Sequence, residues 1–414
     1  MEVAALCLTL VAIVLWAGIS TRAAVISTPI FFVAVGLVLA EGLHLFDVET
    51  DSHQVKIIAE VTLVWVLFAD ASRIRISDLR ADLGRCIRLL GLGLPLTIAS
   101  GALAGYLLLG ISPWYALLLG AALAPTDAAL GSAVMSDQRV PQPVRRVLNV
   151  ESGLNDGIAT PVVMVALAGI ATEAGLAGHE TPGRALLGLL LGALIGVGVG
   201  AGGGLLLRQT RRRGWSSEEF AGPAVLALSL LAYLSAVLAG ANGFVAAFIG
   251  GIAFTLCAGR RGEKEVYYVE QTCRLSSMVA WLLFGALAVP TLTTSLSWQV
   301  VAYAVLSLTI IRMVPVALCL LGSRMDWPTV AFVGWFGPRG LASVVFALIT
   351  LEELHDVPGP VQSVVGTIGF TVLLSVLAHG LSARPLAGRY AATQADQLAT
   401  EESEPIVRRL VSKS

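Results

Sequence analysis

The sequence predicts an all-α polytopic membrane protein with about thirteen transmembrane helices. Of its 414 residues, 56% are hydrophobic and only 13% are charged, and the mean hydropathy is +0.81. Apolar runs of about twenty residues recur along almost the whole chain, and this length crosses a hydrocarbon core as a helix. Hydrocarbon offers no partners to unpaired backbone groups, so the runs are expected to be helices. They are continuously apolar rather than alternating, which excludes an outer-membrane barrel.

Hydropathy windows locate the individual helices to within a few residues at each end. The expected spans are 3–20, 24–43, 54–72, 86–109, 112–136, 146–171, 184–207, 222–239, 241–258, 270–289, 297–321, 327–350 and 361–384.

The loops between these spans alternate in charge, which supports the count because an error of one helix would break the alternation. The odd-numbered loops carry the basic residues, namely Arg22, Arg73, Arg75, Arg80, Arg85, Arg139, Arg145, Arg208, Arg211, Arg212, Arg213, Arg260, Arg261, Lys264 and Arg324. The even-numbered loops carry the acids Asp47, Glu49, Asp51, Glu180, Glu352 and Asp356. The positive-inside rule then predicts a cell-membrane protein with its N-terminus outside and its C-terminus in the cytoplasm.

The spans also suggest an internal repeat. We expect one transmembrane domain over residues 1–390 and a short cytoplasmic tail over 391–414. Within the domain, six-helix repeats at about 3–171 and 222–384 would be joined by a linker helix at about 184–207. An offset of seven helices is odd, so the repeats would be inverted in the membrane. The start, Met1 to Val3, lacks a basic segment, so the first run is expected to be a retained helix and not a signal peptide.

Helix-breaking segments stand at corresponding places in the two halves. The first is Ala124–Asp127 in the fifth span, which contains Pro125, and the second is Phe336–Gly340 in the twelfth span, which contains Pro338. In transporters, paired interruptions mark the substrate site, because unwound backbone leaves helix-dipole ends near the bilayer midplane.

The densest polar group inside a span is the segment 151–157. At about 100° per residue, Glu151, Ser152, Asn155 and Asp156 occupy one arc of a helix. Two carboxylates, a hydroxyl and an amide on one face suit a hard monovalent cation, which prefers oxygen ligands. The alternative is a polar stripe that packs against a neighbouring helix, although two buried acids are costly for packing alone.

Other charges inside the spans need partners. Asp127 could neutralise the positive end of a half-helix or bind an ion directly, and both roles stay open. Arg312 and Arg339 each require an acid or free carbonyl groups, and Glu151 is the natural partner of one of them. Asp70, toward the inner end of the third span, could be a ligand or an interfacial residue. The helix at 184–207 has a glycine at every fourth position, which predicts close helix packing.

Several function classes lack support in the sequence. The five cysteines have no paired or metal-ligand spacing, so we expect no cofactor and no structural metal. The net charge of −1 does not suggest a nucleic-acid partner. His379 is the only histidine inside a span, and no hydrolase motif accompanies it, so we expect a transporter rather than an enzyme.

The interrupted segments and the polar helix together carry a family resemblance. The motifs are Pro125-Thr126-Asp127, Glu151-Ser152-Gly153-Leu154-Asn155-Asp156-Gly157 and Gly337-Pro338-Arg339-Gly340. In this order and placement, the sequence resembles the NhaP-type sodium/proton antiporters of the monovalent cation:proton antiporter superfamily. The resemblance extends over nearly the whole chain, and it implies crossing broken helices, a core domain that moves against a dimerisation domain, and a homodimer.

The resemblance also implies the ligands of the transported cation. Asp156 would bind either the cation or a proton, and Ser152 and the Thr126 carbonyl would complete the cation's shell. Asp70 matches a position where members of the family often have Glu, so it could be a further ligand. Ala128 stands where many members have proline, so the break beside it is expected to be milder.

Supporting roles follow from the same resemblance. Asn155 and Asp127 would hold the crossed, unwound helices. Glu151 would pair with Arg312, and Arg339 would support the broken twelfth span.

Electrogenic relatives carry two adjacent aspartates, whereas this chain has Asn155-Asp156. The prediction is electroneutral exchange of one Na+, or Li+, for one proton, with a role in pH homeostasis. The alternatives are K+/H+ exchange and, from another class, a cation channel or membrane sensor on the same fold.

Overall fold

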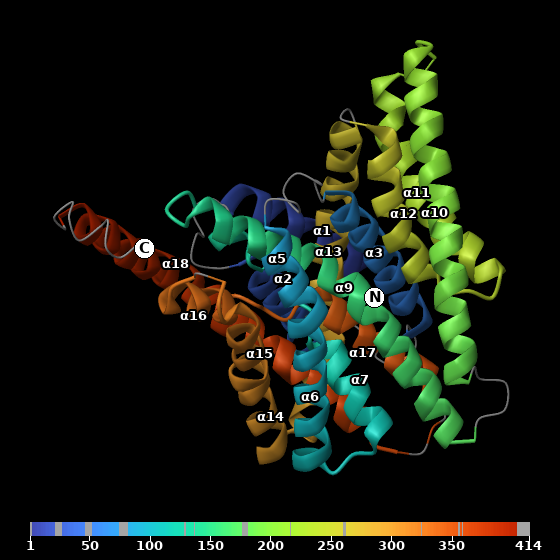
Figure 1. The fold of residues 1–414 in the computed structure, drawn as a ribbon. Coiled ribbons are helices and arrows are strands. Elements are labelled where there is room, and N and C mark those ends of the chain that lie inside the picture. The colour runs from blue at the N-terminus through green and yellow to red at the C-terminus, as the bar shows by residue number, and fades with distance from the viewer. Residues whose placement is uncertain are drawn as a thin grey trace.

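The computed structural model of the chain is helical almost throughout, and no strand occurs among the residues it describes (Figure 1). Those residues are 2–20, 27–45, 52–73, 82–127, 130–135, 137–175, 181–215, 217–259, 262–323, 325–354, 357 and 359–403.

The helices follow the predicted spans in order. The N-terminal half contains α1 (Glu2–Ile19), α2 (Thr28–Leu37), η1 (Val38–Gly42), α3 (Ser52–Arg73), α5 (Leu83–Arg88), η2 (Leu89–Gly93), α6 (Leu94–Leu109), α7 (Pro113–Leu123), α8 (Ser132–Met135) and α9 (Gln142–Glu173). The C-terminal half contains α10 (Pro182–Arg212), α11 (Glu218–Leu238), α12 (Gly243–Ala258), α13 (Gly262–Ser295), α14 (Trp298–Leu308), α15 (Ile310–Leu320), α16 (Trp327–Trp335), α17 (Leu341–Glu353) and α18 (Val361–Ser403).

Every predicted span overlaps one of these helices or a consecutive group of them. By length and composition, 6 helices in the described part of the chain could cross a membrane, so the full number of spans and the inverted repeat remain predictions. The helix at the end of the chain differs most from expectation, because α18 continues through the expected domain boundary at 390 as far as Ser403. Hydropathy detects only the part of a helix that lies in hydrocarbon, whereas backbone hydrogen bonding continues into polar sequence.

Part of the charge pattern behind the predicted orientation lies outside the described residues, so the orientation also remains a prediction. These residues are Arg22, Asp47, Glu49, Asp51, Arg75, Arg80, Glu180, Arg260, Arg261, Arg324, Asp356 and the tail from 404 onward.

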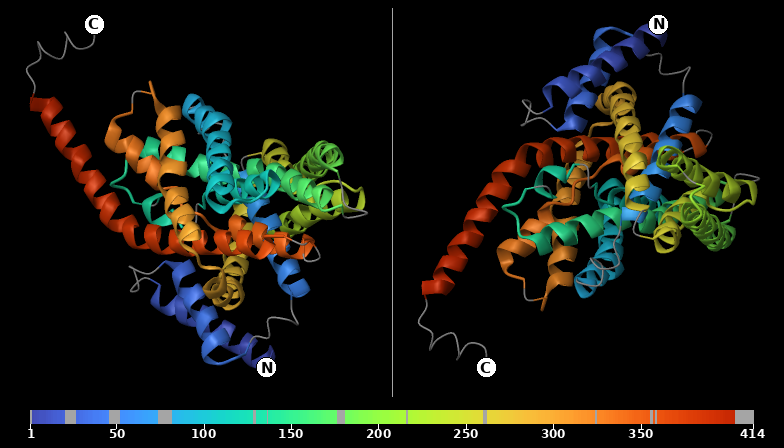
Figure 2. Two further views of the ribbon diagram at one scale, coloured as in Figure 1. Left: turned by 90° about the horizontal axis from the view of Figure 1, so that it is seen from below. Right: turned by 90° about the horizontal axis from the view of Figure 1, so that it is seen from above.

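The helices form two bundles that lie side by side. One contains α2, α3, α10, α11, α12 and α13, and the other contains α6, α7, α9, α14, α15, α16, α17 and α18 (Figures 1 and 2). The bundles meet mainly where α9 packs on α3 and α10, where α17 packs on α3, and where α18 packs on α13. The polar segment of α9 therefore lies close to the boundary between the two bundles.

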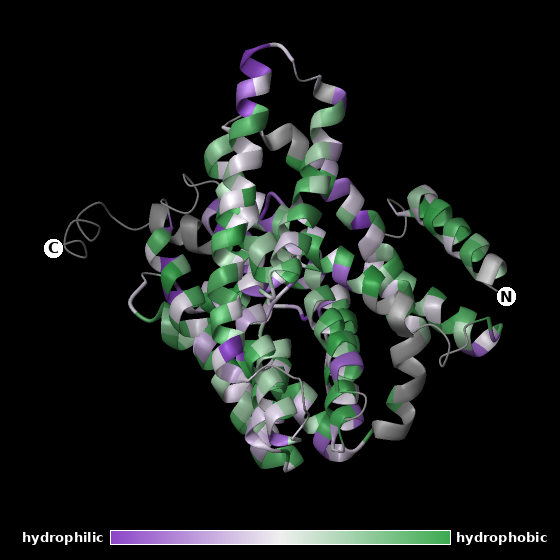
Figure 3. Ribbon diagram, turned by 90° about the vertical axis from the view of Figure 1, so that its right-hand side faces the viewer, coloured by the Kyte–Doolittle hydropathy of each residue, from purple (hydrophilic) through white to green (hydrophobic). Residues whose placement is uncertain are grey.

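The glycine stripe of α10 packs within the chain, as predicted. Gly192, Gly196, Gly200 and Gly204 are buried, and a Cβ on any of them would meet the backbone of α12 or of its N-cap residue Asn242. The other face of α10 exposes leucines such as Leu187 and Leu194, which are 66% and 70% exposed. Hydrophobic residues make up much of the ribbon, while the tip formed by the end of α10 and the start of α11 is hydrophilic (Figure 3). This distribution fits a chain whose middle section faces lipid.

Candidate cation-binding site

The two predicted helix breaks are present and contact each other. Residues 124–127 are not helical between α7 and the four-residue helix α8, and residues 336–340 are not helical between α16 and α17. The Asp127 N–H donates a hydrogen bond to the Pro338 carbonyl oxygen over 2.8 Å. The first break covers residues 124–127, and Ala128, where a milder break was expected, lies outside the described residues.

Asp127 caps the half-helix that begins after the second break. Its carboxylate accepts a hydrogen bond of 3.1 Å from the Leu341 N–H, at the first residue of α17. The N-terminal end of a helix carries a partial positive charge and unpaired N–H groups, which a carboxylate stabilises. Gly340 leaves the space that this requires, because a Cβ there would overlap the Asp127 carboxylate. The structural role predicted for Asp127 is therefore present.

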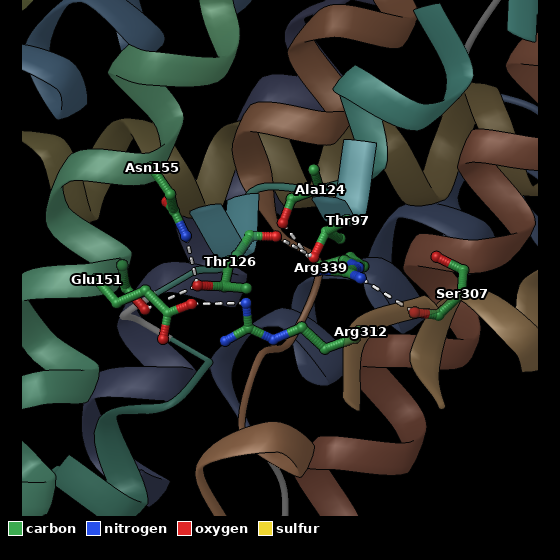
Figure 4. Close-up of polar contacts among 10 residues, drawn as sticks. Thr97, Ala124, Thr126, Glu151, Asn155, Ser307, Arg312 and Arg339 are labelled. Carbon is green, nitrogen blue, oxygen red and sulfur yellow. Dashed lines mark hydrogen bonds and ion pairs between the residues drawn. The ribbon is translucent and has the colours of Figure 1, made fainter. Parts of the chain in front are cut away.

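Arg339 lies in the second break and donates hydrogen bonds to the first break and to α14 (Figure 4). Its side chain is fully buried, and it donates to the Ala124 carbonyl and to the Ser307 carbonyl, each over 3.0 Å. The Ala124 carbonyl stands where α7 has just ended, so no helical N–H is available to it. The guanidinium thus takes the place of the helical donor that the break removes.

Glu151 and Arg312 form a buried ion pair (Figure 4). The distance from Glu151 Oε1 to Arg312 Nη1 is 2.6 Å, and the two side chains are 5% and 3% exposed. This is the pairing that the family resemblance implied. It joins α9 to α15 beside the second break, because Gly337 packs directly on the Arg312 guanidinium.

The polar face of α9 docks on the first break through hydroxyl and amide groups. The Asn155 Nδ2–H donates to Thr126 Oγ1 over 2.6 Å, and Thr126 Oγ1 lies 3.0 Å from Ser152 Oγ. All three side chains are buried. The Thr126 hydroxyl makes these contacts with α9, and the cation-binding role expected of its backbone carbonyl stays a prediction. Asn155 joins the two segments, as the resemblance implied.

Asp156 differs from the other acids of the site. Its side chain is buried, with 8% of the residue exposed, and its carboxylate accepts no hydrogen bond and forms no ion pair with any described residue. The charged groups that act on the Asp156 carboxylate are those of Asp70 and Asp127, which are also acids. A buried carboxylate of this kind is stable when a proton or a bound cation neutralises it.

Asp70 is close to the site but has a partner of its own. It lies at the end of α3, against the backbone of α9 at Gly153, and its carboxylate is 3.7 Å from the Arg73 guanidinium. Arg73 in turn forms an ion pair of 2.7 Å with Glu270 of α13. Nothing in the sequence indicates Glu270 as a partner of Arg73, because the two helices are distant in the chain.

Two further contributors, Ser375 and His379 of α18, were not predicted. Ser375 accepts a hydrogen bond from the Arg339 N–H, and His379 binds the last carbonyl of α16. The only indication in the sequence is that α18 has polar residues at four-residue spacing. That these residues are buried is seen only in the structure.

Comparison with known proteins agrees with this architecture. The transmembrane sodium/hydrogen exchanger family matches residues 8–389, nearly the whole chain. The chain belongs to the sodium/hydrogen exchanger family. The members of this family are described as transmembrane exchangers.

Within this family, the chain is similar in sequence to named relatives and in fold to a solved structure. It is 27% identical over 338 residues to the K+/H+ antiporter NhaP of Alkalimonas amylolytica, and the aligned segment covers 80% of this chain and 57% of the relative. It is 26% identical over 363 residues to the K+/H+ antiporter NhaP2 of Shewanella oneidensis, and this aligned segment covers 85% of this chain and 61% of the relative. The chain thus spans about three-fifths of the length of these relatives.

The fold is similar to that of the sodium proton antiporter MjNhaP1 from Methanocaldococcus jannaschii. The TM-score is 0.77 at 23% identity, over 94% of this chain and 99% of the other. The predicted all-α antiporter fold is confirmed by this likeness.

Proposed function

We propose that this exchanger-family chain carries one monovalent cation, Na+ or Li+, in exchange for one proton, and that Asp156 binds either ion in turn. The observation that carries the proposal is the Asp156 carboxylate, buried without a donor from the described residues beside two helix breaks that contact each other. A group that must be neutralised, and that a proton or a cation can neutralise equally, couples the two ions by competition.

The neighbouring oxygen atoms provide a cation shell of the right chemistry. Ser152 lies one turn before Asp156 on α9, and the Thr126 hydroxyl is 3.0 Å from the Ser152 hydroxyl. Oxygen ligands suit hard cations such as Na+. Asp70 would contribute its negative charge from α3, although its contact with Arg73 reduces that contribution.

The partners of the other acids support electroneutral exchange. Glu151 is paired with Arg312, Asp127 caps α17, and Asn155 carries no charge. One carboxylate is then left to exchange its ion. If it moves with one Na+ in one direction and one proton in the other, both half-cycles carry the same charge.

The two bundles suggest how access would alternate. The bundle that contains α9 and both breaks would move against the bundle that contains α3 and α13, as the resemblance implies. The chain would work as a homodimer in the cell membrane, with its C-terminus in the cytoplasm. It would contribute to pH homeostasis.

K+/H+ exchange is the second candidate. The two relatives described above are named K+/H+ antiporters, and oxygen ligands alone do not distinguish K+ from Na+.

The test is proton movement in proteoliposomes that contain a pH-sensitive dye and start with an acidic lumen. Addition of Na+ or Li+ is expected to alkalinise the lumen, and Asp156→Asn is expected to abolish the response. Glu219→Gln, an exposed acid at the start of α11, is the matched control and should behave as the wild type. A response to K+ alone would establish the second candidate, and no response to any cation would refute the exchanger proposal.

A further inference from the structure

A row of polar side chains lies on one face of α18, inside the bundle that carries the helix breaks. Ser375, His379 and Ser382 are spaced by four and three residues, which places them on the same side of a helix. Ser375 and His379 are completely buried, with 0% and 1% exposed. Buried polar groups in a membrane protein are costly, so their contacts identify what they hold.

All three residues contact the last residue of α16 or the break that follows it. His379 Nε2 lies 2.9 Å from the Trp335 carbonyl oxygen, and the two rings pack with centroids 5.0 Å apart. The Trp335 Nε1–H donates to Ser382 Oγ over 3.0 Å. Near the far end of the break, the Arg339 N–H donates to Ser375 Oγ over 2.7 Å. α18 is therefore bonded to both ends of the break.

These contacts place the His379 ring between two backbone carbonyls. The Trp335 carbonyl oxygen lies 2.9 Å from Nε2 and the Ser375 carbonyl oxygen lies 2.9 Å from Nδ1, and each can only accept a hydrogen bond. Ser375 Oγ accepts from the Arg339 N–H and also lies 3.1 Å from His379 Nδ1. The charged groups that face His379 are Arg339 and Arg312, both positive, so a second proton on the ring would add to their charge. The contact between Nε2 and the Trp335 carbonyl is the one that ties His379 to α16.

The break held in this way leads directly to the cation site. The Pro338 carbonyl, inside the break, accepts from the Asp127 N–H, and the Arg339 side chain donates to the Ala124 carbonyl. Both of these partners flank Thr126, whose hydroxyl contacts Ser152. A shift of the second break would therefore displace the first one.

We infer that His379, together with Ser375, is a positioning residue that sets the geometry of the cation site from α18 without touching the ion. The consequence for transport rests on the proposed function. The mechanical link between α18 and residues 124–127 does not, because it can be measured in a protein that transports nothing.

The test compares His379→Gln with His379→Leu in the full chain. A glutamine amide can still donate to the Trp335 carbonyl, whereas leucine cannot. Loss of an outer partner of an ion site typically weakens affinity about tenfold or more. His379→Leu is expected to raise the KM for the cation about tenfold, with a smaller change in maximal rate. His379→Gln should restore the wild-type KM and leave the pH profile of exchange unchanged.

Hydrogen–deuterium exchange gives a readout that is independent of transport. His379→Leu is expected to speed amide exchange in 336–341 and also in 124–127, and His379→Gln is expected to speed neither. If His379→Leu fails to fold, Ser375→Ala removes the acceptor of the Arg339 N–H and should give the same two changes.

Faster exchange confined to 336–341, or a shift of the pH profile in His379→Gln, would overturn the inference. The first result would mean that the breaks are not linked, and the second that His379 titrates during the cycle. If the wild type moves no cation, the proposed function fails, and the amide exchange of 124–127 still decides whether the link exists.

Discussion

At the scale of single residues, three acids in one site have three different fates, and their partners decide which. Glu151 is paired with Arg312, Asp127 caps α17, and Asp156 has no partner among the described residues. Helical periodicity could predict that Glu151 and Asp156 share a face of α9. It could not predict the cap on α17, because Asp127 and Leu341 are separated by 214 positions and their contact depends on how two breaks cross.

The buried ion pair makes the first prediction. Glu151→Gln leaves the Arg312 guanidinium buried without a counter-charge, which typically costs about 3–5 kcal/mol. The variant is expected to lower the thermal unfolding temperature in detergent, and Glu151→Gln combined with Arg312→Met should recover most of the loss. A single variant as stable as the wild type would show that the pair does not hold α9 to α15.

The cap makes the second prediction. Asp127→Asn keeps an oxygen acceptor for the Leu341 N–H and should retain most of the stability and cation exchange. Asp127→Ala removes the acceptor and should cost about 1 kcal/mol of stability. If Asp127→Asn instead abolished cation exchange as completely as Asp156→Asn, Asp127 would be an ion ligand and not only a cap.

At the scale of helices, local sequence predicted most of what is present. Proline and glycine in 124–127 and 336–340 predicted both breaks, and the four-residue glycine spacing predicted the close packing of α10, whose partner is α12. The missed features depend on packing or on a helix that continues into polar sequence. They are the length of α18 and the hydrogen bonds of Ser375 and His379 at the second break. A hydropathy window gives no weight to such residues.

The packing of α10 on α12 makes the third prediction, with a control in the same helix. A Cβ at Gly200 would overlap the Gly250 carbonyl, whereas a Cβ at Gly198 would meet nothing within 4 Å. Gly200→Ala should therefore lower the thermal unfolding temperature despite the better helix propensity of alanine. Gly198→Ala should leave the unfolding temperature unchanged or raise it slightly, because alanine stabilises a helix by up to about 1 kcal/mol relative to glycine. Equal stability of the two variants would contradict the packing of α10 on α12.

At the scale of the whole molecule, the fold class followed from hydropathy, while the division into two bundles did not. Hydropathy reports only that a helix is apolar, and both bundles contain apolar helices. The bundles become visible only through contacts between distant segments of the same bundle, such as α2 with α13 or α14 with α18. Their boundary runs beside Asp156, which is where alternating access would require it.

The central claim is that Asp156 alone exchanges one cation for one proton. The most direct measurement records luminal pH and transmembrane current together for the reconstituted wild type and Asp156→Asn while Na+, Li+ and K+ are added in turn. The account predicts proton movement driven by a monovalent cation, no steady current in the wild type, and neither signal in Asp156→Asn. A steady current that follows the cation flux, or cation-driven proton movement that survives in Asp156→Asn, would contradict it.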